Sequence, residues 1–171
     1  FSLFFIALLA FGGGWISSWA ISRAQITLPF LDGPLMGPGG AAIVGEPINR
    51  LTLTLGDCFN SYVVGGELIT TKVPCAQPHR NEVYKTQAHP ARFGDPWPGD
   101  DALQNLAQRL CYGEFAGFVG VIYELSSLTI GAITPPRASW EDPKARYRGM
   151  QCYVSRADGS PLTGSVQNTR I

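Results

Sequence analysis

The stretch best equipped for chemistry is CAQPHRNEV at residues 75–83. Cys75 lies four positions before His79, and a thiol so close to an imidazole can bind a metal ion or serve as an activated nucleophile. Glu82 adds a carboxylate that could take part in acid–base work. The alternative is a polar turn after a disulfide, in which His79, Arg80 and Glu82 hydrogen-bond to the backbone and to each other. We favour this second interpretation.

The wider sequence gives little support to a metal site or to catalysis. A zinc site would have to add Cys58 or His89 to Cys75 and His79, but the chain has only two histidines and no Cys-x-x-Cys pair. A hydrolase would combine Asp57 and His79 with a serine, but no serine has a Gly-x-Ser-x-Gly context. No Gly-rich phosphate loop is present. We therefore expect no enzymatic activity, no metal, no cofactor and no small-molecule substrate.

The overall composition narrows the class of protein. The chain has 171 residues, 13 basic and 13 acidic, and only 15% of it is charged. A nucleic-acid binder needs a basic surface to displace counterions from phosphates, so this class is not expected. The 13 prolines and 20 glycines are typical of a loop-rich α+β or β domain rather than a helical bundle.

The N-terminal residues 1–22, FSLFFIALLAFGGGWISSWAIS, contain no charged side chain, and Arg23 is the first. Twenty residues of helix are about 30 Å long, which matches the hydrocarbon core of a bilayer. We expect a transmembrane helix here, with Trp15 and Trp19 at one headgroup boundary. A secretory signal peptide is the alternative, since Ala20-Ile21-Ser22 is a passable cleavage site.

All four cysteines, Cys58, Cys75, Cys111 and Cys152, follow this segment. An even number in a small domain beyond a membrane helix favours disulfides in an oxidising compartment. We expect a single-pass protein of the cell membrane, with a cytoplasmic N-terminus and an extracytoplasmic C-terminal domain. Four cysteines permit three connectivities, and sequence alone does not choose among them. We favour the sequential pairs, Cys58–Cys75 across adjacent strands and Cys111–Cys152 between a helix and a late strand.

Residues 23–50 are a Pro/Gly-rich apolar linker, in which no long helix or regular strand is expected. A solvated tether would normally be polar, so this one should lie on a surface. That surface is either its own domain or a partner membrane protein. Apolar groups that the domain cannot bury mark interfaces. The residues expected to contact a partner complex are Phe4, Phe5, Leu8, Trp15 and Trp19 in the anchor, and Phe30, Leu31, Leu35 and Met36 in the linker.

Residues 51–171 form the expected globular domain. Alternating or β-rich patterns predict strands over 51–59, 67–74, 81–89 and 148–156, and a short last strand over 161–166. A turn at Gly56-Asp57 should interrupt the first of these. The best helix is 100–111, which should start at an Asp100 N-cap and stop at Gly113. Residues 117–133 should form a helix end or strand and then a strand.

The predicted fold class is therefore α+β. It comprises one N-terminal transmembrane helix and a small disulfide-stapled extracytoplasmic domain, with mixed or antiparallel strands and one main helix.

Several of these segments, in order over about residues 55–166, together resemble the extracytoplasmic septum formation domain family of actinobacteria. The Cys-Ala-Gln-Pro-His-x-x-Glu-Val element is the most specific of them. The segments are GDCF (56–59), VPCAQPHRNEVY (73–84), PGDDAL (98–103), Cys111 with FVGVIYELSSL (118–128), SW (139–140), CYV (152–154) and DGSPLTGSV (158–166).

The resemblance implies a non-catalytic envelope domain, held by two disulfides, in single-pass membrane proteins. Our first expectation is an accessory subunit that binds and stabilises a larger actinobacterial membrane complex, with the cytochrome bcc–aa3 respiratory supercomplex as the candidate. The alternative is a cell-division envelope protein that acts in septum formation. In either case the partners expected are an integral membrane protein complex and, through residues 1–22, the lipid bilayer.

Overall fold

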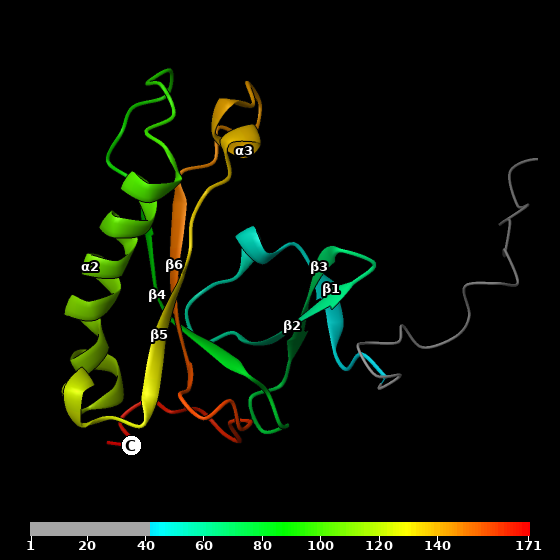
Figure 1. The fold of residues 1–171 in the computed structure, drawn as a ribbon, viewed down its shortest axis with the longest axis vertical. Coiled ribbons are helices and arrows are strands. Elements are labelled where there is room, and N and C mark those ends of the chain that lie inside the picture. Colours follow the sequence, from blue (N-terminus) through cyan, green and yellow to red (C-terminus); the bar gives the residue numbers. More distant parts are fainter. Residues whose placement is uncertain (1–41) are drawn as a thin grey trace, which may run out of the picture. The chain divides into compact units, whose positions relative to one another are not determined.

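The computed structural model describes residues 42–171, which form one six-stranded sheet with a long helix on one face (Figure 1). The strand order is β1-β3-β2-β4-β6-β5, and every neighbouring pair is antiparallel. The strands are β1 (Glu46–Ile48), β2 (Cys58–Val64), β3 (Glu67–Val73), β4 (Asn81–Ala88), β5 (Leu128–Ile133) and β6 (Gly149–Arg156). The helices are α2 (Asp100–Val119) and α3 (Arg137–Glu141), with 3-10 turns at Arg50–Thr52 and Tyr123–Leu125. The expected α+β class with two disulfides is confirmed.

Helix α2 lies along β4, β5 and β6 (Figure 1) and is longer than the sequence predicts. It passes through Gly113 and ends where Gly120 takes the left-handed conformation of a C-cap. The expected stop was wrong because Phe115, Phe118 and Val119 continue the buried face, and their burial outweighs the cost of the two interior glycines, Gly113 and Gly117. The expected Asp100 cap was also wrong, since Gly99 occupies the N-cap position.

The hairpin of β2 and β3 turns at Gly65-Gly66, where each glycine has a positive φ. Strands β3, β4 and β6 agree with the sequence expectation to within a residue or two, whereas β2 was expected only as the end of a strand over 51–59 and continues to Val64. The strand expected at 51–55 was wrong, because a 3-10 turn begins at Arg50 instead. The alternation of apolar and polar residues here belongs to a loop, in which Leu53 is buried while Thr52 and Thr54 are exposed.

Two smaller differences concern the ends of the described chain. The linker was expected to hold no regular strand, but Glu46–Ile48 pair with β3 as the short edge strand β1. Pro47 is tolerated there because an edge strand has one side that needs no donor. Residues 161–166 do not form a strand. Only an isolated bridge joins Leu162 to His79.

The core has two parts, one on each side of the sheet. Neighbouring side chains of β4 separate into them, Tyr84 into the larger and Val83 into the smaller, because successive residues of a strand face opposite ways. The larger part lies between α2 and β4–β6 and contains Cys111, Phe115, Phe118, Val119, Leu128, Cys152, Val154, Leu162 and Val166. The smaller part contains Leu53, Phe59 and Ile133.

The predicted membrane helix at 1–22 and most of the linker lie outside the described residues. The same holds for all nine residues expected to contact a partner, from Phe4 to Met36. Within residues 42–171, no helix combines the length and the apolar character needed to cross a bilayer.

Candidate functional site

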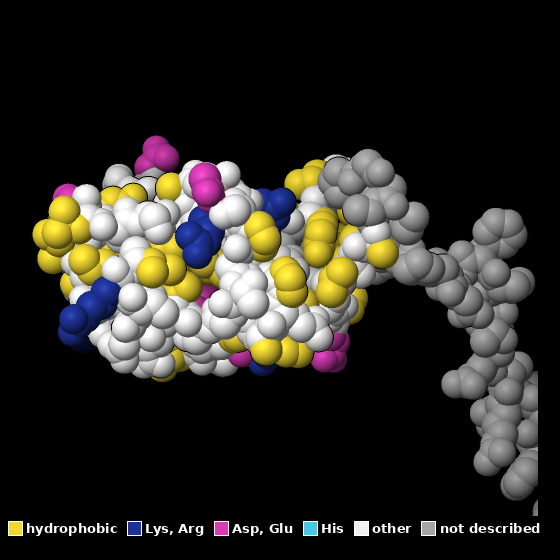
Figure 2. All heavy atoms as spheres, turned by 90° about the horizontal axis from the view of Figure 1, so that it is seen from below, with side chains coloured by type: hydrophobic (Ala, Val, Ile, Leu, Met, Phe, Trp, Pro, Cys, Tyr) yellow, Lys and Arg dark blue, Asp and Glu magenta, His cyan; other side chains and the backbone are white. Residues whose placement is uncertain are grey.

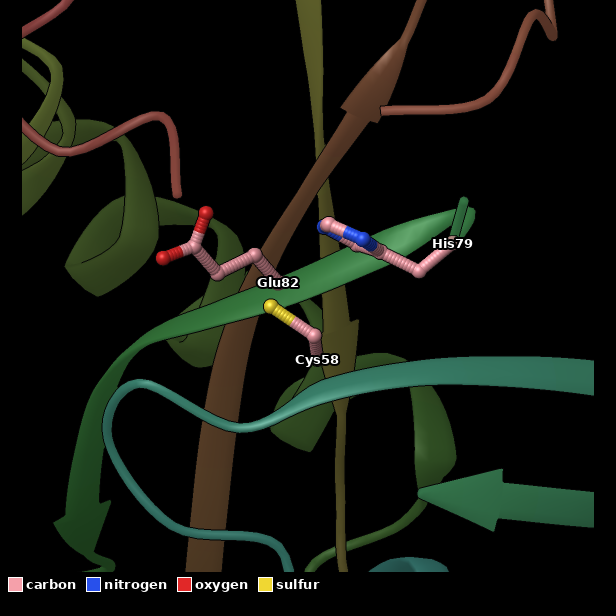
Figure 3. A group of neighbouring side chains, drawn as sticks. All are labelled: Cys58, His79 and Glu82. Carbon is pink, nitrogen blue, oxygen red and sulfur yellow. The ribbon is translucent and has the colours of Figure 1, made fainter. Parts of the chain in front are cut away.

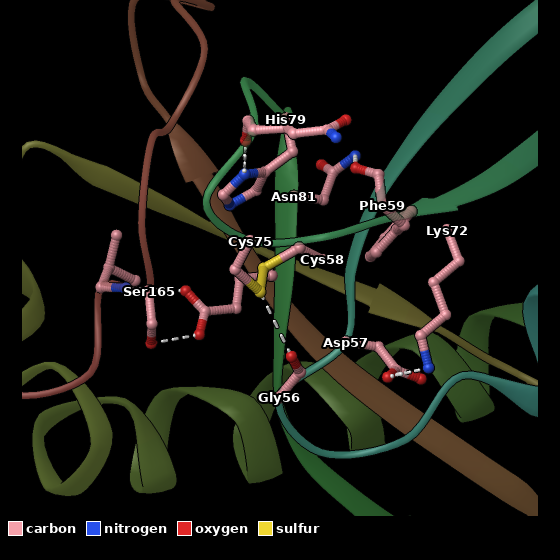
Figure 4. The surroundings of a disulfide bond; sticks show 12 residues. Gly56, Asp57, Cys58, Phe59, Lys72, Cys75, His79, Asn81 and Ser165 are labelled. Atoms are coloured by element: carbon pink, nitrogen blue, oxygen red, sulfur yellow. Dashed lines mark hydrogen bonds and ion pairs between the residues drawn. A yellow bond between two sulfur atoms is a disulfide. The ribbon is translucent and has the colours of Figure 1, made fainter. Parts of the chain in front are cut away.

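The four cysteines form two disulfides, Cys58–Cys75 and Cys111–Cys152, with Cα–Cα distances of 5.2 and 5.3 Å. The favoured sequential connectivity is confirmed. Cys58–Cys75 joins the start of β2 to the loop after β3, and its Cys75 Sγ lies 3.5 Å from the Gly56 carbonyl oxygen (Figure 4). Cys111–Cys152 fastens α2 to the interior strand β6 within the larger core.

His79 is almost completely buried, at 1% exposure, in the loop before β4. Its backbone exchanges two hydrogen bonds with Leu162, and its Nδ1 lies 2.8 Å from the Gln77 carbonyl oxygen (Figure 4). A carbonyl only accepts, so Nδ1 carries the proton and donates it. Nε2 is buried and has no hydrogen-bond partner among the described residues. The histidine therefore closes a loop through its backbone and one ring nitrogen.

Glu82 is also 1% exposed, although carboxylates are rarely buried without partners. Its Oε1 accepts a hydrogen bond of 2.5 Å from the Ser165 hydroxyl, and its Oε2 accepts one of 2.7 Å from the Val166 backbone N–H. Hydrogen bonds to a charged acceptor are about twice as strong as neutral ones. This carboxylate thus holds the C-terminal segment against β4.

Cys58, His79 and Glu82 come together in one buried place (Figure 3), with potential ligand atoms within 4.8 Å of one another. The sequence suggests Cys58 and His79 as possible ligands, whereas Glu82 joins them only in the structure. The Cys58 sulfur is bonded to Cys75, and a disulfide sulfur is not the thiolate that a metal needs. The Glu82 oxygens are occupied by Ser165 and Val166. The arrangement suits a structural junction better than a metal centre or a nucleophile.

The polar turn expected at His79, Arg80 and Glu82 is present, but its side chains and backbone bond to distant parts of the chain. Arg80 donates from Nη1 to the Gly159 carbonyl oxygen at 2.7 Å, and its backbone N–H donates to the Asn60 side chain. No hydrogen bond joins His79, Arg80 and Glu82 to each other within the described residues. The motif therefore ties β2, β4 and the C-terminal loop together.

Asp57, the third residue considered for catalysis, also has a structural environment. Its Oδ1 lies 2.6 Å from Lys72 Nζ (Figure 4). Its Oδ2 accepts hydrogen bonds from the Thr54 backbone N–H and hydroxyl. Burial acts to raise the pKa of Asp57, but these bonds outweigh it and hold the pKa below its ordinary value. A carboxylate so stabilised in its ionised form is a poor general base at neutral pH.

The surface of residues 42–171 carries several large exposed hydrophobic side chains. Val63 and Leu68 are cross-strand partners in the β2–β3 hairpin and are 60% and 49% exposed. Ile122 and Leu125 are exposed beside the 3-10 turn after α2. The face shown in Figure 2 has hydrophobic side chains among neutral polar ones, without a gathering of one charge sign.

One further group of side chains is not predicted by any sequence pattern. Arg148 at the start of β6 is buried and stacks on Trp140 of α3, beside the loop that contains Phe93. The only local signal was Ser139-Trp140 in the family resemblance. Neither the burial of Arg148 nor its contact with Trp140 can be read from spacing.

Comparison with known proteins identifies one relationship. Residues 55–170 match the family model described as septum formation. No curated protein and no solved structure matches the chain.

Proposed function

The chain belongs to the septum formation family, and from that premise we propose that it is a non-catalytic envelope protein that acts in septum formation by binding other proteins. The match over residues 55–170 is the observation that carries the proposal. It favours the division role, which was the alternative at the level of sequence. Nothing in the described residues speaks for the respiratory supercomplex, which stays a prediction.

The non-catalytic part of the proposal is supported by what the reactive-looking groups do. The four cysteines are oxidised, Glu82 and His79 are each 1% exposed, and Asp57 is bound to Lys72. A nucleophile or a general base must reach its substrate, and these groups face their own chain. They stabilise a rigid domain whose surface is free for binding.

We further propose that this domain lies outside the cytoplasm, on a membrane anchor at residues 1–22 with its N-terminus in the cytoplasm. Two disulfides in one small domain support an oxidising compartment. The partner is an integral membrane protein complex. It contacts the anchor and linker residues named above, and the Val63–Leu68 pair, an exposed apolar surface of the described domain.

The test is performed in cells from which the native chain has been depleted. A fluorescent fusion of the full chain is expected to gather at the division site, and depletion is expected to lengthen cells through delayed septa. Affinity purification in mild detergent should recover division proteins. Normal cell length after depletion, together with recovery of oxidase subunits and no division proteins, would overturn the proposal in favour of the respiratory one.

A pair of matched variants tests the contact surface. Val63→Thr with Leu68→Thr removes the apolar pair while keeping side chains that suit a strand. It is expected to reduce recovery of the partner. Ile122→Thr with Leu125→Thr removes equally exposed groups elsewhere and is expected to leave recovery unchanged. Loss of recovery only in the second pair would move the contact to the end of α2.

A further inference from the structure

Two loops at one end of the sheet enclose a hollow of about 460 Å³. One loop follows β4, and the other includes α3 and leads into β6, so the two lie together at the upper end of Figure 1. No residue of the motif at 75–83 lines the hollow. Its principal lining residues are Phe93, Trp140, Glu141, Asp142, Arg146 and Arg148.

Arg148 is 7% exposed, and its guanidinium carbon lies 3.6 Å from the centre of the Trp140 ring. Nη1 donates hydrogen bonds to the carbonyl oxygens of Trp140 and Tyr147, at 2.8 and 3.1 Å. None of the ion pairs among residues 42–171 includes this arginine. A buried guanidinium without a carboxylate is unusual, because taking the charge out of water is costly unless an anion compensates it.

Part of the guanidinium is left for a ligand. Nη2 makes no hydrogen bond to the described residues and is accessible to solvent. Nε is buried and has no hydrogen-bond partner among these residues. Stacking on Trp140 and the two bonds of Nη1 hold the plane of the group in one orientation. A guanidinium fixed in this way presents the N–H groups of Nη2 to an anion without further loss of side-chain freedom.

The charges around the hollow leave a positive excess. Arg146 is exposed and lines the hollow with Arg148, and each guanidinium lies 5.9 Å from the centre of the Phe93 ring. Of the two carboxylates in the lining, Glu141 is paired with Arg137, and Asp142 accepts hydrogen bonds from the backbone N–H groups of residues 144 and 145.

His89 packs edge-on against Trp140, beside Arg148. Burial and the positive charge of Arg148 lower its pKa. Its Nδ1 accepts a hydrogen bond from the Ala91 backbone N–H, as a neutral imidazole can.

We infer that this hollow is a binding site for a carboxylate carried by an apolar body, such as the C-terminal residue of a peptide. Arg148 and Arg146 bind the carboxylate, and the exposed ring of Phe93 covers the apolar part, while the buried ring of Trp140 holds Arg148 in place. A volume of about 460 Å³ holds a residue-sized group as well as an anion. Since Glu141 and Asp142 lie in the same lining, a single negative charge fits better than the double charge of phosphate. The inference is independent of a role in septum formation.

The experiment uses the full chain in detergent and N-acetyl-L-phenylalanine as the probe. The matched control ligand is N-acetyl-L-phenylalanine amide, which has the same ring but no charge. Binding is measured by titration of the indole N–H signal of Trp140 and the ring signals of His89 in NMR spectra. The acid is expected to bind at least tenfold more tightly than the amide, and inorganic phosphate more weakly than the acid. Tighter binding of phosphate than of the acid would overturn the carboxylate assignment.

Variants separate the binding role of Arg148 from a purely structural one. Arg148→Met is expected to weaken binding of the acid at least tenfold, and Arg146→Gln, which alters an exposed side chain, two- to fivefold. Arg109→Gln removes an exposed arginine on α2 and is expected to change nothing. If Arg148→Met does not fold, the effect of Arg146→Gln and the comparison of acid with amide still test whether the hollow binds a carboxylate. Equal binding of acid and amide, or no effect of Arg146→Gln, would leave Arg148 a structural residue and refute the site.

Discussion

Asp57 illustrates how single side chains in this domain are committed to structure. It lies at the start of β2, where Lys72 and Thr54 supply three contacts to its carboxylate. Glu82 has a similar role with Ser165 and Val166, on the other side of the Cys58–Cys75 disulfide. Each carboxylate joins segments distant in sequence. At the residue scale, the groups that look reactive in the sequence are thus accounted for as structural contacts.

The lowered pKa of Asp57 predicts an acid-sensitive contribution to stability. A carboxyl whose pKa is lower in the folded than in the unfolded state stabilises the fold above the unfolded value of 3.8, and this contribution is lost as pH falls through the folded value. Asp57→Asn should lower the free energy of unfolding at pH 6 by about 1–2 kcal/mol, a modest figure because Lys72 is half exposed. It should also flatten the decline below pH 4. Urea unfolding between pH 2 and 6 measures both effects.

The exposed Glu67 in the β2–β3 hairpin provides the control for this prediction. Glu67→Gln removes a carboxylate that makes no ion pair with other residues of the described chain, and the pH profile should stay that of the parent protein. Parallel profiles for Asp57→Asn and the parent down to pH 2 would contradict the role given to Asp57.

At the scale of elements, two glycines inside regular secondary structure have opposite roles. Gly113 lies inside α2, and a Cβ there would meet no atom within 4 Å. Gly131 lies in β5 opposite Tyr153 of β6, and a Cβ there would collide with the Tyr153 ring. The first glycine is a cost to its helix, whereas the second makes room for an aromatic side chain in the sheet.

This contrast predicts stability changes of opposite sign. Gly113→Ala should raise the free energy of unfolding by about 0.5–1 kcal/mol, since alanine loses less backbone entropy in a helix. Gly131→Ala should lower it by about 1–3 kcal/mol, because the Tyr153 ring or the strand must shift. Chemical denaturation of the two variants beside the parent measures both values. A change of the same sign in both would refute the assignment.

At the scale of the whole molecule, the two disulfides restrict the unfolded chain to different extents. Cys58–Cys75 closes a loop of sequence separation 17, and Cys111–Cys152 one of 41. In the loop-entropy description, the disulfide that closes the shorter loop contributes about 3 kcal/mol to the free energy of unfolding, and the one that closes the longer loop about 4 kcal/mol. Replacing Cys111 and Cys152 by alanine should therefore destabilise the protein more than replacing Cys58 and Cys75, as measured by denaturant unfolding.

The reducing agent dithiothreitol serves as the control for the disulfide prediction. It should lower the stability of each double-alanine variant further, because the remaining disulfide is still present. A variant lacking all four cysteines should not respond to it. A larger loss for the shorter loop would show that native contacts around Cys58 outweigh chain entropy.

Much of this protein follows from local features of its sequence. Alternation and turn residues located β3, β4 and β6, the apolar spacing located the first half of α2, and the order of four cysteines among strands favoured the correct pairing. The septum formation motif was recognisable because its residues are close together. These signals depend on neighbours a few positions apart, which the chain presents without being folded.

Other features were decided only by tertiary structure. α2 continues past Gly113 because its last turns are buried against the sheet, and residues 51–55 form no strand because no neighbouring strand pairs with them. Glu82 finds Ser165 more than eighty positions away, and Arg148 meets Trp140 and the Phe93 loop only when β4 and β6 pair. The free energy that stabilises these features comes from burial and from pairing between segments distant in sequence. They exist only once distant segments have been brought together, so local spacing does not reveal them.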